Sequence, residues 1–234
     1  MKNGFTLAEV LITLGIIGVV AAITIPTLIQ KQTNNIIEGR LKKFYTTINQ
    51  AVLLSENEFG NKSLWWQDLH GAELDEDGNM VVEASEAEKW FMKYVGKNLN
   101  IVDRKFINGG TGFGNANGIF VVYFADGSAF GQMQNHTTRD WVFYPGDPEK
   151  CIKRHGSLYN ALGHCAFAFN FAPSFPDDGF TRIQDKAFEP YIFNWNETQS
   201  LLFSNCVASG FFCTTLIQQN NWTIPDNYPR KVHK

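Results

Sequence analysis

A long apolar segment near the N-terminus constrains this chain more than any other feature. Residues 5–29 contain a single charged side chain, that of Glu9. A helix of this length rises about 37 Å at about 1.5 Å per residue, which is enough to cross a hydrocarbon core of about 30 Å. The segment therefore predicts a single-pass transmembrane helix. It also raises the question of why an acid lies among apolar residues.

A removable secretory signal is the alternative explanation for this segment. Val20, Ala21 and Ala22 offer the small residues of a cleavage site, and cleavage there would leave Ile23 as the first residue. The apolar core of a secretory signal is normally about 7–15 residues long, however, and this run is longer and contains an acid. We therefore prefer a membrane anchor.

Charges and cysteines give opposing indications about orientation. Lys31, Arg40, Lys42 and Lys43 follow the apolar segment, and an excess of positive residues favours the cytoplasmic side. The cysteines all lie in the C-terminal half, and an even number of them favours disulfides in an oxidising compartment. We give the cysteines more weight and expect an inner-membrane protein whose C-terminal body lies outside the cytoplasm.

The four cysteines can pair in three ways. Pairing Cys151 with Cys165 and Cys206 with Cys213 closes the shortest loops, and Ser209-Gly210 can turn the chain within the second loop. The other two pairings stay open.

Two segments of the sequence offer an alternative in metal binding. A zinc site is the alternative because His155 and His164 lie beside the first two cysteines, but no CxxC or HxxxH spacing supports it. The acidic segment 73–86 is similar to a calcium loop, yet its glycine is in the wrong place when the loop starts at Asp75. When the loop starts at Glu73, the twelfth residue is Ala84 rather than an acid. We expect no metal or other cofactor, with calcium at this acidic turn left open.

Five residues at the start of the chain have a characteristic spacing. Lys2 and Gly4 precede Phe5, and Glu9 and Pro26 are the fifth and twenty-second residues when counting begins at Phe5. This pattern resembles the N-terminal signature of type IV pilins and of the pseudopilins of type II secretion. The resemblance implies cleavage between Gly4 and Phe5 by a prepilin peptidase, N-methylation of Phe5, an assembly role for Glu9 and a kink or local melting of the helix at Pro26.

Elementary electrostatics is consistent with that role for Glu9. A carboxylate in hydrocarbon costs about 3 kcal/mol at the centre and less near the interface. Cleavage would create an ammonium on Phe5, and a neighbouring copy could bring this cation to within about 4 Å of Glu9. At an effective dielectric constant of about 20, the attraction is roughly 4 kcal/mol. Thr6-x-x-Glu9 is also a helix capping box, which explains the acid by itself and is compatible with assembly.

Beyond Pro26 the apolar residues return at helical spacing. We expect one interrupted helix from about Phe5 to Phe59, ended by Gly60-Asn61. Its second half carries a stripe that should pack on the globular body, although a coiled-coil partner is the alternative. The stripe consists of Ile37, Leu41, Phe44, Ile48 and Val52.

The rest of the chain predicts an antiparallel sheet. Ser85-x-x-Glu88 should open a second helix with Trp90, Phe91, Tyr94 and Val95 on its apolar side. Residues 119–133 should form a hairpin about Asp126-Gly127. Residues 166–171 alternate strictly, which places three phenylalanines on one face of a strand. The fold class is α+β, a long N-terminal helix packed on an antiparallel sheet. We expect a leader at 1–4, an assembly helix at 5–29, its amphipathic continuation at 30–60 and a globular domain at 61–234.

The sequence contains no recognisable catalytic motif. The glycine-rich segment 109–118 lacks nucleotide-binding spacing, residues 127–131 are not a nucleophile elbow, and the five histidines are scattered. A net charge of −3 gives no indication of nucleic-acid binding. We expect a non-enzymatic subunit of a type IV pilus or a type II secretion pseudopilus.

The resemblance also implies partners and a location. The partners are the peptidase and methylase, other pilin or pseudopilin subunits, inner-membrane assembly proteins and membrane lipid, and the assembled filament is periplasmic or extracellular. The alternative is an anchored or secreted extracytoplasmic binding protein that uses aromatic loops such as residues 188–196.

Overall fold

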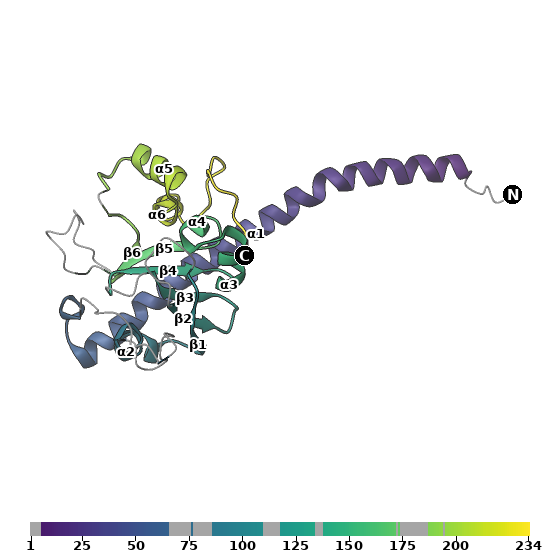
Figure 1. The fold of residues 1–234 in the computed structure, drawn as a ribbon. Coiled ribbons are helices and arrows are strands. Elements are labelled where there is room, and N and C mark those ends of the chain that lie inside the picture. The colour runs from purple at the N-terminus through teal and green to yellow at the C-terminus, as the bar shows by residue number, and fades with distance from the viewer. Residues whose placement is uncertain are drawn as a thin grey trace.

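One long helix and one antiparallel sheet organise the molecule (Figure 1). The structure is a computed structural model that describes residues 6–65, 76, 86–109, 118–133, 138–171, 173, 187–193 and 195–234. The helices are α1 (Leu7–Phe59), α2 (Glu86–Tyr94), α3 (Pro148–His155), α4 (Leu158–Ala161), α5 (Gln199–Ala208) and α6 (Cys213–Gln219), with 3₁₀ turns η1 (Lys62–Leu64) and η2 (Gly96–Asn98). The strands are β1 (Ile101–Ile107), β2 (Ile119–Phe124), β3 (Ala129–Gln132), β4 (Asp140–Tyr144), β5 (Phe167–Phe171) and β6 (Phe188–Pro190).

Helix α1 follows the sequence prediction closely. It starts after Thr6 and ends at Gly60, whose φ of +75° is a conformation that glycine adopts at little cost. Figure 1 shows its first half projecting away from the body and its second half crossing it. The helix continues through Pro26 without interruption, so the expected local melting does not occur.

Threonine side chains on both sides of Pro26 bond to helix carbonyls. Thr24 Oγ1 donates to the Val20 carbonyl at 2.9 Å, and Thr27 Oγ1 donates to the Thr24 carbonyl at 2.8 Å. Neither hydroxyl bonds the Ala22 carbonyl, which is the one that lacks its helix donor because Pro26 has no N–H, so these contacts are ordinary threonine bonds to the preceding turn. The structure shows a continuous, gently curved helix, and a sharper kink at Pro26 stays a prediction.

The predicted apolar stripe of α1 packs on the sheet rather than on a coiled-coil partner. Ile37, Leu41, Ile48 and Val52 are buried against sheet residues in one core cluster. Phe44 lies at the centre of this contact, with its ring centroid 4.4 Å from that of Phe143 in a stacked arrangement. Burial of this stripe fixes the second half of α1 to the body.

The sheet is a meander in which every strand pairs with its neighbour in sequence. Its order is β1-β2-β3-β4-β5-β6, and all five pairings are antiparallel. The predicted hairpin is present as β2 and β3, and its turn contains Gly127 at a φ of +78°. This confirms the α+β layout.

Both faces of the sheet are covered, which the alternation in residues 166–171 did not reveal. Phe167, Phe169 and Phe171 face the core beneath α1, as predicted. Ala166 and Ala168 face a second core cluster that includes residues of α3 and α4. The small alanines allow these short helices to lie close to the sheet.

The remaining helices extend the body. Helix α2 is the predicted second helix, with Trp90 and Phe91 buried, whereas the expected cap Ser85 lies outside the described residues. Helices α5 and α6 were not predicted. They enclose a third apolar cluster around Trp195, Leu202 and Phe212.

Candidate assembly site on the N-terminal helix

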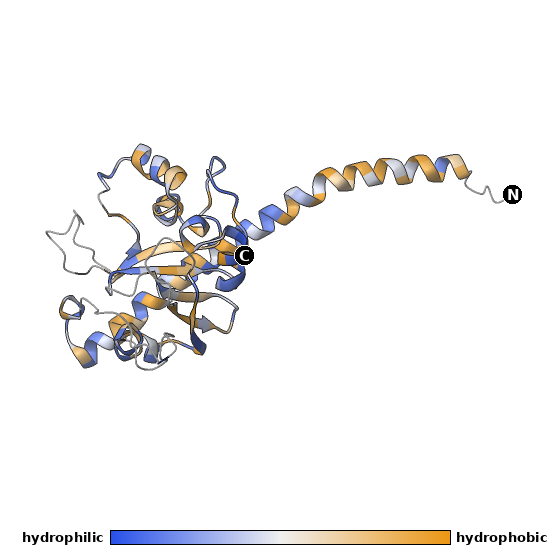
Figure 2. Cartoon of the chain, viewed as in Figure 1, coloured by the Kyte–Doolittle hydropathy of each residue, from blue (hydrophilic) through white to orange (hydrophobic). Residues whose placement is uncertain are grey.

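The first half of α1 presents apolar side chains that nothing in the described chain covers. From Thr6 to Ile29 every residue except Ala21 is exposed, and Leu7 retains 78% of its accessible surface. Figure 2 shows this projecting segment dominated by apolar residues. Among the described residues, α1 is the one helix whose length and composition suit a membrane span. A surface of this kind requires lipid or other protein around it.

Thr6 and Glu9 form the capping box that the sequence predicted. Glu9 Oε2 accepts hydrogen bonds from the Thr6 backbone N–H at 2.8 Å and from Thr6 Oγ1 at 2.7 Å. Thr6 Oγ1 in turn accepts a hydrogen bond from the Glu9 N–H at 3.3 Å. This arrangement satisfies two backbone donors at the start of the helix.

Capping uses only one of the two carboxylate oxygens of Glu9. Within the described part of the chain, Oε1 accepts no hydrogen bond, and the side chain is exposed at the tip of the projecting helix. Gly4 and Phe5 lie outside the described residues, so their cleavage and methylation stay predictions. The carboxylate can cap its own helix and still receive a cation from another molecule.

Two glycines of the projecting helix leave open space on its surface. A Cβ added at Gly15 or Gly18 would meet no atom within 4 Å. Small residues of this kind allow two helix backbones to approach closely.

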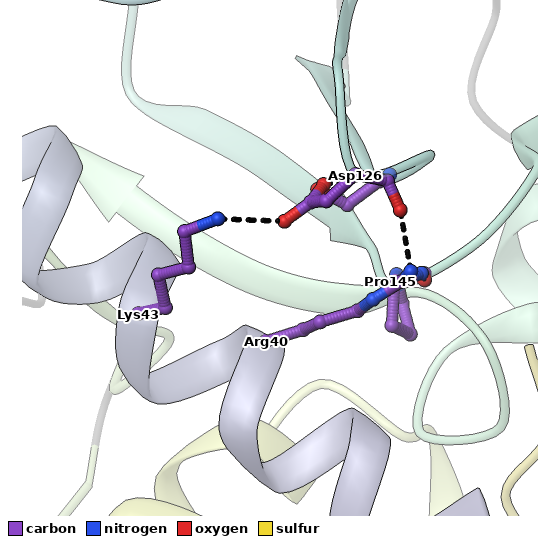
Figure 3. Close-up of polar contacts among 5 residues, drawn as sticks. Arg40, Lys43, Asp126 and Pro145 are labelled. Atoms are coloured by element: carbon purple, nitrogen blue, oxygen red, sulfur yellow. Dashed lines mark hydrogen bonds and ion pairs between the residues drawn. The ribbon is translucent and has the colours of Figure 1, made fainter.

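A polar clamp holds α1 to two turns of the body (Figure 3). The Arg40 guanidinium donates to the backbone carbonyls of Asp126 and Pro145, and Lys43 Nζ lies 3.0 Å from Asp126 Oδ2. Burial acts to raise the pKa of Asp126, but hydrogen bonds from Ser128 and Lys43 outweigh it and lower the pKa to about 2. Asp126 is therefore ionised and tied to the helix at neutral pH.

The C-terminal segment 224–234 braces α1 where it leaves the body. Gln30 Nε2 donates to the Val232 carbonyl at 3.1 Å, and the Ile224 N–H donates to Glu38 Oε1 at 2.8 Å. Figure 1 shows the C-terminus beside this part of α1. The clamp and this segment together set the direction in which the first half of α1 projects.

The cysteines form the pairing that closes the shortest loops. The disulfides are Cys151–Cys165 and Cys206–Cys213. All four cysteines of the chain are therefore paired, and none is a free thiol. Arg230 connects the two loops, because its guanidinium donates to the carbonyls of Leu162 and Cys206. The zinc alternative with cysteine thiolates as ligands was therefore wrong for the oxidised chain.

Three histidines gather beside the first disulfide. The sequence drew attention to His155 and His164, whose rings stack with centroids 4.7 Å apart, but not to His233, whose Nε2 lies 3.0 Å from His155 Nε2. Burial lowers the pKa of all three imidazoles, that of His233 to about 4. The acidic segment considered for calcium lies almost entirely outside the described residues.

Two other sequence features have structural roles. Ser128, the serine of the segment compared with a nucleophile elbow, sits in the β2–β3 turn and donates to Asp126. In the aromatic segment proposed as a ligand-binding loop, Phe188 and Trp195 are buried in core clusters.

Comparisons with known proteins agree with this geometry. Residues 1–25 match the prokaryotic N-terminal methylation motif, and residues 27–232 match a family described as a family of unknown function, DUF6613. Neither the curated proteins nor the solved structures include a match. The chain therefore belongs to this family of unknown function and is a prepilin-type, type IV pilin-like protein.

Proposed function

We propose that this chain is a non-enzymatic structural subunit of a type IV pilus or of a type II secretion pseudopilus. The observation that carries the proposal is the first half of α1, an exposed apolar helix that overlaps the methylation motif. It bears a carboxylate of which one oxygen accepts no hydrogen bond from the described residues. Prepilin peptidase and methylase would process it between Gly4 and Phe5. Its later partners would be other pilin-type subunits and the inner-membrane assembly proteins.

The two halves of α1 are suited to different tasks. From Ile37 onward the apolar stripe is already buried against the sheet, so it is not available to another subunit. Residues 6–29, apart from Ala21, remain exposed and can exchange lipid for the helices of other copies. Transfer from lipid to protein changes little hydrophobic free energy, because both surroundings are apolar. Polar contacts must therefore supply much of the preference for the assembled state.

Glu9 is suited to supply that preference. Its capping bonds need only Oε2, which leaves Oε1 for the N-terminal ammonium of an adjacent subunit. An ion pair at about 4 Å contributes roughly 4 kcal/mol at an effective dielectric constant of about 20, comparable with the cost of placing the acid in hydrocarbon. N-methylation leaves the amine basic, so the attraction persists.

The proposed topology is a single pass through the inner membrane with the body outside the cytoplasm. Two disulfides in the body support this placement, because such bonds persist in oxidising compartments. Processed subunits would then enter a periplasmic or extracellular filament. The buried aromatics of residues 188–195 support a structural body more than a ligand-binding one.

Mass spectrometry of the N-terminus tests the proposal. We expect protein from cells with an active prepilin peptidase to start at a methylated Phe5, and protein from cells that lack the peptidase to start upstream of it. A chain that starts at Ile23 would indicate ordinary secretion. A chain that keeps Met1 although the peptidase is active would indicate a simple anchor, and either result would overturn the proposal.

A further inference from the structure

Histidines from α3, from the turn after α4 and from the C-terminal segment meet beside the Cys151–Cys165 disulfide. His155 is the last residue of α3, His164 precedes Cys165, and His233 belongs to the C-terminal segment. The backbone N–H of His233 donates to the His164 carbonyl at 3.0 Å, which holds the C-terminal segment in place. The backbones that carry His164 and His233 are therefore held together by a hydrogen bond.

The nitrogens of His155 and His233 are directed at one another. Their Nε2 atoms are 3.0 Å apart, and a contact this short requires at least one of them to present a lone pair. A zinc ion bonds imidazole nitrogen at about 2.0–2.1 Å, so two such ligands at 90–110° are separated by about 2.9–3.4 Å. The observed separation falls within that span. An ion at these bond lengths would lie about 1.4 Å off the line between the two nitrogens, so each ring would turn toward it as the ion replaces the proton that they share.

His164 supports this pair without joining it. Its Nδ1 lies 2.8 Å from the Lys231 carbonyl, and since a carbonyl can only accept, Nδ1 carries the proton. The His164 ring stacks on that of His155 with planes inclined by 20°, which restrains the plane of the His155 ring. Orientation of a ligand by such neighbours is common at metal sites.

From this geometry we infer a binding site for a divalent late transition ion such as Zn²⁺ or Cu²⁺, with His155 Nε2 and His233 Nε2 as its protein ligands. The nitrogens of these histidines and Cys165 Sγ all lie within 4.8 Å of one another. The sulfur is held in the disulfide and offers no thiolate, so water completes the coordination in the oxidised chain. Imidazole donors suit zinc, copper and nickel, whereas calcium and magnesium require oxygen ligands.

A bound ion would fasten α3 to the C-terminal segment. That segment also bonds to α1 through Gln30 and Glu38, so the ion would stiffen the junction between the body and the projecting helix. The inference does not depend on the proposed filament role. It concerns the body alone and would hold for a binding protein as well.

Calorimetric titration of the full-length chain with Zn²⁺ tests the inference. The protein is purified in detergent without a polyhistidine tag, and a thiol assay verifies that both disulfides are intact. We expect one saturable site per chain that excess Ca²⁺ does not displace. We also expect Cu²⁺ to bind more tightly than Zn²⁺, as the usual order of metal affinities requires.

The variants His155→Gln and His233→Gln should each weaken Zn²⁺ binding at least about tenfold, because each removes one of two protein ligands. Lys234→Gln is the matched control, since it alters the residue next to His233, keeps both imidazoles and should bind as the wild type does. Circular dichroism verifies folding, and should His155→Gln fail to fold, His233→Gln carries the test. Absence of saturable binding by the oxidised wild type, binding only after disulfide reduction, or undiminished binding by His233→Gln would overturn the inference.

Discussion

Replacing Phe44 by alanine should weaken the attachment of α1 to the body more than any change on the exposed side of the helix. The Phe44 side chain is 6% exposed and lies among four phenylalanine rings. Its ring centroid is 6.2 Å from that of Phe124, 4.6 Å from Phe130, 4.4 Å from Phe143 and 5.4 Å from Phe169. These rings come from strands β2 to β5, so the cavity would open between the helix and the centre of the sheet.

The expected loss of stability in Phe44→Ala follows from the removal of a buried aromatic side chain. Truncation of a phenylalanine in a packed core costs about 3–5 kcal/mol in the free energy of unfolding. In a domain of this size each kcal/mol lowers the melting temperature by about 2–4 °C, so we expect a decrease of roughly 6–20 °C. Thermal unfolding of the detergent-solubilised chain, followed by tryptophan fluorescence, measures it.

Leu53→Ala on the same helix is the control, because Leu53 is 62% exposed. A substitution at such a surface position changes stability by about 0.5 kcal/mol or less. Equal effects of the two substitutions, or a loss below about 1 kcal/mol for Phe44→Ala, would refute the conclusion that the stripe of α1 forms the core of the body.

Three further predictions concern the clamp and the disulfides. Arg40→Gln should lower the free energy of unfolding by about 2 kcal/mol in urea titrations, since Arg40 makes charge-assisted hydrogen bonds to two carbonyls, and Arg40→Lys should recover only part of this. Because the folded-state pKa of Asp126 is about 2, below its ordinary value of 3.8, its contribution should be present above about pH 4 and lost as the pH falls toward 2. After allowance for solvent screening at the exposed Lys43 we expect about 1 kcal/mol, and unfolding of Asp126→Asn should lack this step. Replacing both Cys151 and Cys165, which are 14 residues apart, by serine should lower the free energy of unfolding by about 3 kcal/mol. The same change at Cys206 and Cys213, which are 7 residues apart, should lower it by about 2.5 kcal/mol. Equal unfolding midpoints for these variants and the oxidised wild type would contradict this prediction.

Features with a local period could be predicted from the sequence. The start and end of α1, its stripe from Ile37 to Val52 and the hairpin about Gly127 all depend on residues close together in the chain. The same is true of the Thr6–Glu9 capping box, since helix geometry alone brings those side chains together.

One missed element did carry a local signal. Helix α3 begins with Asp147 as a cap and Pro148 in the first turn, and it ends at Gly156 with a φ of +80°. These are recognised start and stop residues of a helix, but the element is only eight residues long and has no extended stripe.

Other features depend on contacts between distant segments, which periodicity cannot reveal. Burial of both faces of β5 requires α3 and α4 to fold back over Ala166 and Ala168. The Arg40 clamp joins residues about 86 and 105 positions apart, and the approach of His233 to His155 spans 78 positions. Such pairs become visible only when the tertiary fold is known.

The proposed function depends most on the negative charge of Glu9, and a comparison of two variants tests the role of that charge most directly. Glu9→Gln keeps an acceptor for the Thr6 cap but removes the charge, whereas Thr6→Ala removes the cap, at a cost of about 1 kcal/mol in helix stability, and keeps the charge. The measurement is the fraction of processed subunit recovered in sheared filaments rather than in membranes. We expect Thr6→Ala to assemble nearly as the wild type does and Glu9→Gln to remain in the membrane after normal cleavage. Normal filament content with Glu9→Gln would contradict the account.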